Sequence, residues 1–284
     1  MNKLGLIESY IREMPSLPVS VKKVLEICNN SGCNPSDLNQ VISLDPVLTG
    51  GLLKLINSAY YGLSSHITSL VKAITMLGIN TVKNLVLASA VLGTLPKNKG
   101  ISGLNMEGYW RHCLCVGVTS KLLAAKQGID PKYHQEYFTA GLMHDIGKIP
   151  LNAVFGEEYV NAVAAADREN KRLVVSENEI FGINHCMSGQ IISDMWKLDS
   201  SIKDAIVWHH SLKEYSGENS KILCTVTIAN YFAVAYEVGF SGYRKPKKLD
   251  NFVWETIGLN DDVFEILKDR VYQEIEKAQI FLNI

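Results

Sequence analysis

This 284-residue sequence has no excess of positive or negative charge, no long apolar run and no export signal. The formal net charge is -1, which predicts no overall attraction to nucleic acid or to an anionic membrane. The most apolar run, residues 85–95, is much shorter than the roughly 20 residues that a membrane-spanning helix needs. The N-terminus lacks the charged start and cleavage site of a secretory signal. We therefore expect a cytoplasmic protein with no membrane and no nucleic-acid partner.

Paired cysteines and strand patterns are missing as well. The six cysteines contain no C-x-x-C pair, which favours reduced thiols over disulfides or a cysteine-bound metal. Proline is scarce, with 8 residues, and no segment sustains the alternation of apolar and polar residues that strands show. Apolar residues instead recur at helical spacing almost throughout. The sequence therefore predicts an all-α fold, a multi-helix bundle.

Local signals predict several helix ends and one boundary. Asp45-Pro46 is typical of a helix N-terminus, with an acid at the N-cap and proline at the first helical position. Gly78 suits a left-handed C-cap. The sequence Ser176-Glu177-Asn178-Glu179 fits a capping box, which predicts the start of a helix that carries His185. The polar stretch 96–100 breaks helix and predicts a boundary between residues 1–97 and 98–284.

Five of the seven histidines form an ordered series along the second half of the chain. Taken singly, each is explained as a core histidine, and the last two as a cationic pair at a helix C-terminus. Burying an unpaired polar group costs roughly 2–7 kcal/mol, so five such groups on apolar helices need a shared explanation. A divalent cation held by several helices would satisfy them together. The members of this series are His112, His144 with the adjacent Asp145, His185, and the pair His209-His210.

Two cationic motifs accompany the series. Lys148 follows Gly147 in the sequence HDIGK, where a tight turn would let its side chain return to the site and stabilise a phosphate or another anion. The run Arg244-Lys245-Pro246-Lys247-Lys248 is interpreted as a solvated loop. His66 and His134 fall outside the series, and we expect both in loops or at the surface.

A larger set of motifs resembles the HDOD family, bacterial signalling modules related to the HD and HD-GYP metal-dependent phosphohydrolases. The resemblance extends roughly from residue 11 to residue 235. The matching segments are Leu17-Pro18, Asp45-Pro46-Val47-Leu48-Thr49, Asn57-Ser58-Ala59-Tyr60-Tyr61-Gly62, Trp110-Arg111-His112, Leu142 to Lys148, Phe181 to His185, Trp196 and His209-His210.

The resemblance implies an N-terminal helical subdomain, residues 1–97, packed on an HD-like helical subdomain, residues 98–284. It also implies a role in signal transduction, and many members of the family have lost their metal ligands. Asn230 stands where the catalytic relatives carry an aspartate, and the GYP element after the histidine pair is replaced by 211–215. The residues that match the metal-binding positions of those relatives are His112, His144, Asp145, His185, His209 and His210, with Asn230 at the closing position.

The asparagine has a chemical consequence, because a neutral amide oxygen binds a cation more weakly than a carboxylate. Asp145 would be the only clear anion among several imidazoles. Such a donor set disfavours Mg²⁺ and Ca²⁺ and favours Fe, Ni, Zn or Mn. The half of a dinuclear site built on His112, His144 and Asn230 would be affected more than the half built on Asp145, His185 and His209, to which His210 is a further candidate ligand.

Two functions follow from these patterns. The first is a regulatory interaction module that acts through a signalling protein partner and keeps a catalytically impaired HD-like pocket. The second is a metal-dependent phosphodiesterase acting on a nucleotide or cyclic dinucleotide, in which Asp145 serves catalysis and Lys148 braces the substrate phosphate. The histidines favour the second, whereas Asn230 and the missing GYP element favour the first.

Overall fold

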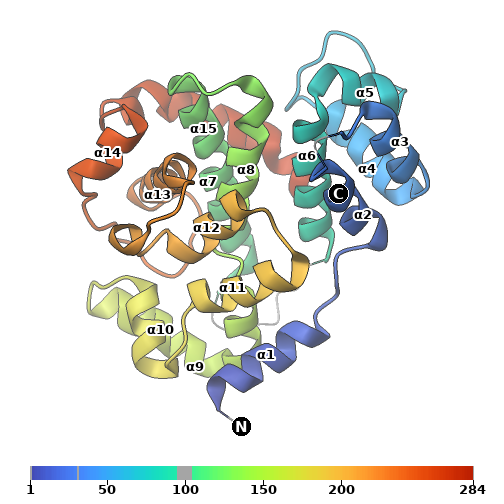
Figure 1. The fold of residues 1–284 in the computed structure, drawn as a ribbon. Helices are drawn as coiled ribbons and strands as arrows, with labels where there is room; N and C mark the ends of the chain where they lie inside the picture. The colour runs from blue at the N-terminus through green and yellow to red at the C-terminus, as the bar shows by residue number, and fades with distance from the viewer. Residues whose placement is uncertain (1, 31, 95–103, 284) are drawn as a thin grey trace.

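The computed structural model describes residues 2–30, 32–94 and 104–283, which form helices and connecting loops without any strand (Figure 1). This confirms the predicted all-α fold. The segment 96–100, where the sequence predicts a boundary, lies outside the described residues. The division into residues 1–97 and 98–284 therefore stays a prediction.

The N-terminal helices form a compact group on one side of the molecule (Figure 1). In this group α2 lies against α3 and α6, while α5 contacts α3, α4 and α6. Helix α1 lies elsewhere, against α9 and α11 at the other end of the molecule. The bounds are α1 (Lys3–Glu13), α2 (Val19–Cys28), α3 (Pro35–Ser43), α4 (Pro46–Ile56), α5 (Leu70–Leu77) and α6 (Ile79–Thr94).

In the second half of the chain, α7 is buried on nearly all sides because α8, α13 and α15 pack against it. A helix that is buried all round loses the one-sided polar pattern of a surface helix. The bounds are α7 (Met106–Lys126), α8 (His134–Met143), α9 (Lys148–Arg168), α10 (Leu173–Phe181), α11 (His185–Trp196), α12 (Ser200–Trp208), α13 (Ser220–Ala235), α14 (Asn251–Ile257) and α15 (Val263–Ala278), with short 3-10 turns at η1 (Pro131–Tyr133), η2 (Leu212–Glu214) and η3 (Gln279–Asn283).

The predicted helix ends near the N-terminus are confirmed, whereas the capping box is wrong. The Asp45 carboxylate accepts hydrogen bonds from two backbone N–H groups of α4, and Gly78 ends α5 with φ 84°. Ser176 lies inside α10, which begins at Leu173, and the helix that carries His185 begins at His185 itself. Tertiary contacts of Glu177, described below, explain why this segment is not a helix start.

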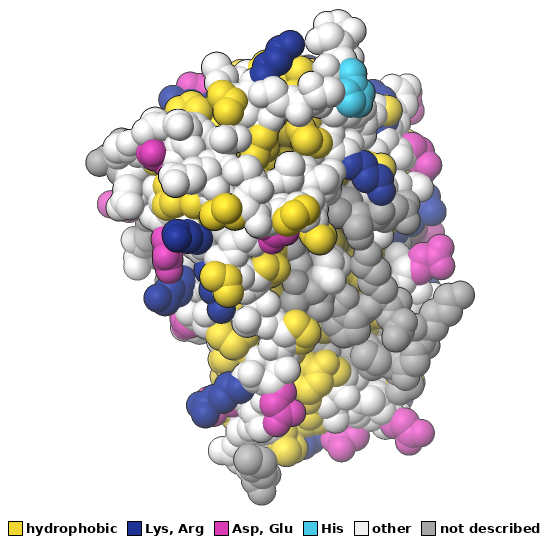
Figure 2. Space-filling view, turned by 90° about the vertical axis from the view of Figure 1, so that its right-hand side faces the viewer, with side chains coloured by type: hydrophobic (Ala, Val, Ile, Leu, Met, Phe, Trp, Pro, Cys, Tyr) yellow, Lys and Arg dark blue, Asp and Glu magenta, His cyan; other side chains and the backbone are white. Residues whose placement is uncertain are grey.

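No single helix among the described residues has both the length and the apolar character to cross a membrane; the pair Leu70–Leu77 and Ile79–Gly93, bent by 114°, reaches that length only together. The face in Figure 2 carries its hydrophobic side chains in separated groups among polar ones. The most exposed aliphatic side chains of the described residues include Val19, Leu44 and Val47.

Candidate metal centre

Helix ends bring the predicted site residues together in the interior of the second half of the chain. Asp145 and His144 follow α8, and His209 and His210 follow α12, so each pair stands where a helix gives way to a turn. His185 is the first residue of α11. His112 on α7 and Asn230 on α13 approach from two long buried helices.

Asp145 lies between two groups of histidines. Its Oδ2 atom is 3.3 Å from His144 Nε2 and 3.8 Å from His112 Nε2. Its Oδ1 atom is 3.5 Å from His185 Nε2 and 3.6 Å from His209 Nε2. Ligand atoms that share one ion at about 2.0–2.2 Å lie roughly 3–4 Å apart, which these separations match.

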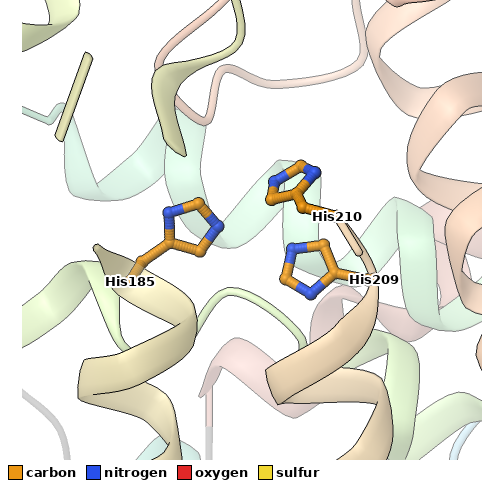
Figure 3. Close-up of side chains that lie close together, drawn as sticks. All are labelled: His185, His209 and His210. Atoms are coloured by element: carbon orange, nitrogen blue, oxygen red, sulfur yellow. The ribbon is translucent and has the colours of Figure 1, made fainter. Parts of the chain in front are cut away.

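The histidine rings are oriented by hydrogen bonds at their other nitrogen. His144 Nδ1 lies 2.7 Å from the Gly141 carbonyl, and His209 Nδ1 lies 2.9 Å from the Ala205 carbonyl. A carbonyl oxygen only accepts, so Nδ1 carries the proton and Nε2 presents its lone pair. Figure 3 shows the rings of His185 and His209 turned toward a common space, with His210 beside them.

The atoms that face this space are buried and lack hydrogen-bond partners. They are the Nε2 atoms of His112, His144, His185 and His209, together with Asp145 Oδ1 and Asn230 Oδ1. Buried polar atoms are normally paired, and so many unpaired acceptors in one place point to a missing electrophile. The donor set of imidazole nitrogen with one carboxylate fits a divalent transition metal. Two groups could hold an ion, His112 with His144 and Asp145, and His185 with His209 and His210.

Burial sets the charge of the site. Desolvation and the neighbouring His144 lower the pKa of His112 to about 3, and desolvation lowers the pKa of His209 to about 4. Desolvation and His209 place the pKa of His210 well below its ordinary value. Burial opposes ionisation of Asp145, but His144 and Lys148 outweigh it and hold the pKa of Asp145 well below its ordinary value. The imidazoles of His112, His209 and His210 are therefore neutral at pH 7, beside an ionised carboxylate.

Lys148 turns back toward the site, but it contacts protein groups there. Its Nζ atom donates to Asp145 Oδ2 at 2.5 Å and to the Ser241 carbonyl at 2.8 Å. The side chain is 1% exposed and does not line the cavity beside the histidines. Its ammonium group therefore neutralises the one carboxylate of the centre, and the role in bracing a substrate phosphate stays a prediction.

An open cavity of about 280 Å³ reaches the histidines from the surface. His209, His210 and Asn230 form its inner wall. Asn230 is buried on α13, and its Nδ2 atom is 3.4 Å from the Tyr243 hydroxyl. The cationic side chains that line the cavity are Arg172, Lys213, Lys247 and Lys248.

The sequence analysis interpreted the basic run 244–248 as a solvated loop and did not place it beside the histidines. Lys247 and Lys248 are exposed, as a solvated loop predicts, but the loop lies beside the histidines. Arg172 was not singled out from sequence, and its Nη1 atom donates to the His210 carbonyl at 3.1 Å. His66 lies in an exposed loop as expected, and His134 is partly buried at the start of α8.

Glu177 is a second residue that the sequence analysis did not identify as part of the site. Its Oε2 atom accepts from the backbone N–H of His185 at 2.9 Å and lies 2.5 Å from His185 Nδ1. Its Oε1 atom accepts from the Tyr159 hydroxyl at 2.6 Å. The carboxylate thereby fixes the ring and the tautomer of His185, the arrangement that orients histidine ligands in metal sites.

We predict that Glu177→Gln lowers the affinity for a transition metal about 10–100-fold, the usual effect of removing a carboxylate that orients a histidine ligand. The glutamine side chain has the same shape, but it has one acceptor oxygen, whereas Glu177 accepts hydrogen bonds through both Oε1 and Oε2. Metal competition against a chromogenic chelator measures the change. Glu179→Gln is the control, because Glu179 is exposed and pairs with Lys171 away from the site. Equal affinities in the two variants would contradict the role of Glu177.

The sequence of this chain matches a known protein family. The family model of the HDOD domain matches residues 14–212. This chain belongs to the HDOD family. The predicted membership is therefore confirmed, and the HDOD match covers the site residues described above up to His210, whereas Lys213, Asn230 and the segment that carries Ser241 and Lys248 follow it.

Individual relatives of this HDOD chain share its fold at low identity. An HDOD domain protein of unknown function from Geobacter sulfurreducens has a TM-score of 0.78 at 23% identity, covering 98% of each chain. A candidate phosphohydrolase from Shewanella amazonensis has a TM-score of 0.72 at 23% identity, covering 97% of this chain and 98% of its own. An uncharacterised protein of Treponema pallidum is 23% identical over 87% of this chain. The match spans 47% of that protein, about half its length.

Proposed function

We propose that this HDOD chain is a regulatory interaction module whose HD-like pocket binds a transition-metal ion, Fe, Ni, Zn or Mn, and is catalytically impaired. The observation that carries the proposal is the convergence of unpaired buried acceptors from four histidines, Asp145 and Asn230. When bound, a divalent ion supplies Lewis acidity and lowers the pKa of water. The protein supplies imidazoles oriented by Glu177 and by backbone carbonyls.

Impairment follows from the charges around the centre. Among the described residues, Asp145 is the only carboxylate whose oxygens face both histidine groups, and Lys148 already pairs with it. Asn230 contributes an amide oxygen where an acid would add a second negative charge. The centre therefore has little negative charge to hold a hard cation, and the buried ammonium of Lys148 lies beside its carboxylate. Such a centre favours tight ligation by imidazole over hydrolytic turnover.

Metal analysis of purified protein, followed by a phosphodiesterase screen with Mn²⁺ or Fe²⁺, tests the proposal. We expect near-stoichiometric metal and no turnover. Turnover that disappears in Asp145→Ala would instead support a phosphodiesterase. Protein that binds no transition metal at micromolar concentration would contradict the metal-binding pocket itself.

We predict that Asn230→Asp raises affinity for divalent metal by about tenfold or more, because charged ligands bind cations more strongly and a factor of ten corresponds to about 1.4 kcal/mol. The side chain keeps its size at a position that is 5% exposed. The gain should be larger for Mn²⁺ than for Zn²⁺, since carboxylate suits the harder ion. Calorimetric titration of both proteins measures it. A substitution that raises neither affinity nor activity would mean that Asn230 does not occupy the closing ligand position.

A regulatory module needs a protein partner, and one exposed surface suits it. Ser20 Oγ donates to Asp45 Oδ2 at 2.6 Å, which joins the starts of α2 and α4. Val19, next to Ser20, and Val47, two residues after Asp45, are 81% and 86% exposed. Exposed aliphatic side chains at one end of the N-terminal helices support contact with a signalling protein. The Asn57–Tyr61 motif contributes less surface, because Tyr60 is buried.

The cavity beside His210 favours a second candidate, a phosphohydrolase acting on a nucleotide or cyclic dinucleotide. Arg172, Lys213, Lys247 and Lys248 surround it, while Glu214 and Asp250 are its acidic residues. This excess of positive charge at the mouth of a metal centre suits a phosphodiester. Arg172→Gln tests the candidate: a phosphohydrolase would lose affinity for its substrate, whereas a metal-binding module would keep its metal.

A further inference from the structure

A second cavity lies between the segment that follows α4 and the helices α7 and α15. It has a volume of about 320 Å³ and is separate in its lining residues from the histidine centre. Tyr60 and Tyr61 form one wall, and the cationic side chains Lys121, Arg270 and Lys277 form the others. We call it the Lys121 cavity. In Figure 1 its walls come from the segment that follows the light-blue α4, the green α7 and the red α15.

Lys121 is a cation without an anionic partner. Its Nζ atom donates to the Tyr60 hydroxyl at 2.9 Å and lies 4.1 Å from the centre of the Tyr60 ring. No carboxylate of the described residues lies within 4.0 Å of it. Burial lowers the pKa of Lys121 to about 8, although Glu274 partly opposes this. The surroundings therefore disfavour the charge that the side chain carries at neutral pH, and an anion would stabilise it.

The other charges of the Lys121 cavity do not compensate it. Glu274 is its acidic residue, and that carboxylate pairs with Lys277 at 2.8 Å. Arg270 has no carboxylate partner among the described residues. With three cations and one carboxylate, the lining has a formal charge of +2.

We propose that the Lys121 cavity binds a small phosphomonoester. The charge excess matches a dianion, and guanidinium with ammonium is the donor pair that binds phosphate oxygens. The remaining space, beside the Tyr60 and Tyr61 rings and the apolar side chains of Val118 and Leu122, accommodates a small organic group. The site does not depend on the function proposed for the histidine centre. Because its walls come from three separate parts of the chain, the bound ligand would hold them together.

Equilibrium dialysis of the full chain with radiolabelled inorganic phosphate tests this assignment. We expect Lys121→Met and Arg270→Gln each to weaken phosphate binding by about tenfold or more, the effect of losing one charge-assisted hydrogen bond. Two variants are controls. Lys268→Gln removes a charge from the same helix, where Lys268 lies over the Tyr236 ring, and Arg172→Gln alters the cavity beside the histidines. Both controls should bind phosphate at the Lys121 cavity as the unmodified protein does.

Four results would overturn the assignment. Unchanged binding in Arg270→Gln and Lys121→Met excludes the cavity, and Arg270→Gln alone decides if Lys121→Met fails to fold. Loss of all binding in Arg172→Gln places phosphate beside the histidines instead. Equal weakening in Lys268→Gln indicates attraction to surface charge, and displacement by succinate as readily as by phosphate indicates a dicarboxylate ligand. Metal content, measured on the same samples, reports the histidine centre independently.

Discussion

Gly147→Ala is expected to prevent folding or to destabilise the protein by more than about 4 kcal/mol, an exceptional effect for a single methyl group. A Cβ atom at Gly147 would lie 1.9 Å from the His185 carbonyl oxygen and 2.4 Å from the Gly189 backbone nitrogen. Both are backbone atoms at the start of α11, so no side chain can rotate away. Relief would require α11 to move, and His185 would leave the metal centre with it.

Sterics alone cause this effect, because Gly147 has φ -67°, which any residue adopts. Gly50 is the matched control: it lies in α4, and a Cβ there would meet nothing within 4 Å. Gly50→Ala should leave stability unchanged or raise it by up to about 1 kcal/mol, since alanine favours helix. Urea unfolding followed by circular dichroism compares the two. A Gly147→Ala protein as stable as Gly50→Ala would mean that the loop after α8 and α11 do not pack as closely as described.

Asp145→Asn is expected to lower metal affinity by more than about 100-fold, beyond the effect of losing a residue that only orients a ligand. It removes the anion whose two oxygens face all four central Nε2 atoms. It also leaves Lys148 buried without its counter-ion. Breaking a buried ion pair from one side typically costs about 3–5 kcal/mol, so the metal-free variant should also be less stable.

The double variant Asp145→Asn, Lys148→Met separates the two effects. Methionine fills the volume of the lysine stem without a charge, so most of the lost stability should return while metal affinity stays low. Chemical unfolding of metal-free protein and metal competition are measured on the same preparations. If the double variant is no more stable than Asp145→Asn, the pairing of Lys148 with Asp145 contributes little to the fold. If either variant binds metal as the unmodified protein does, Asp145 is not a ligand.

Helix ends were predictable from sequence where local chemistry decides them. Asp45 caps α4 through its carboxylate and the N–H groups of the next few residues, and Gly78 ends α5 through its own backbone, so their residue types sufficed. Ser176-Glu177-Asn178-Glu179 has equally good local chemistry for a cap, yet it lies inside α10. Glu177 instead serves His185, eight residues away and in another helix. A contact between helices overrode the local preference, and no pattern in a single segment reports such a contact.

The convergence of the histidines was predictable because their number and order made separate explanations costly. The surroundings of the centre were not. Lys247 and Lys248 line the cavity only because the chain after α13 returns past His210, and loop composition does not encode that path. Lys148 was expected to approach the site and does, but its contact with the Ser241 carbonyl depends on the same returning segment. Residue type and order predicted which histidines converge, whereas topology determined their neighbours.

Helix α1 packs on the second half of the chain, so cutting the chain between its halves would remove a helix that the second half needs. Although first in sequence, it lies on α9 and α11, with Lys3 over the ring of Phe181 at 4.9 Å and paired with Glu158 at 3.0 Å. A fragment that starts at residue 98 would lose this cover, and the fully buried Ile7 and Ile11 would no longer shield the apolar surface beneath them. The helices that hold His185 would then meet water, so a shortened chain would be prone to aggregate unless residues 3–13 were retained.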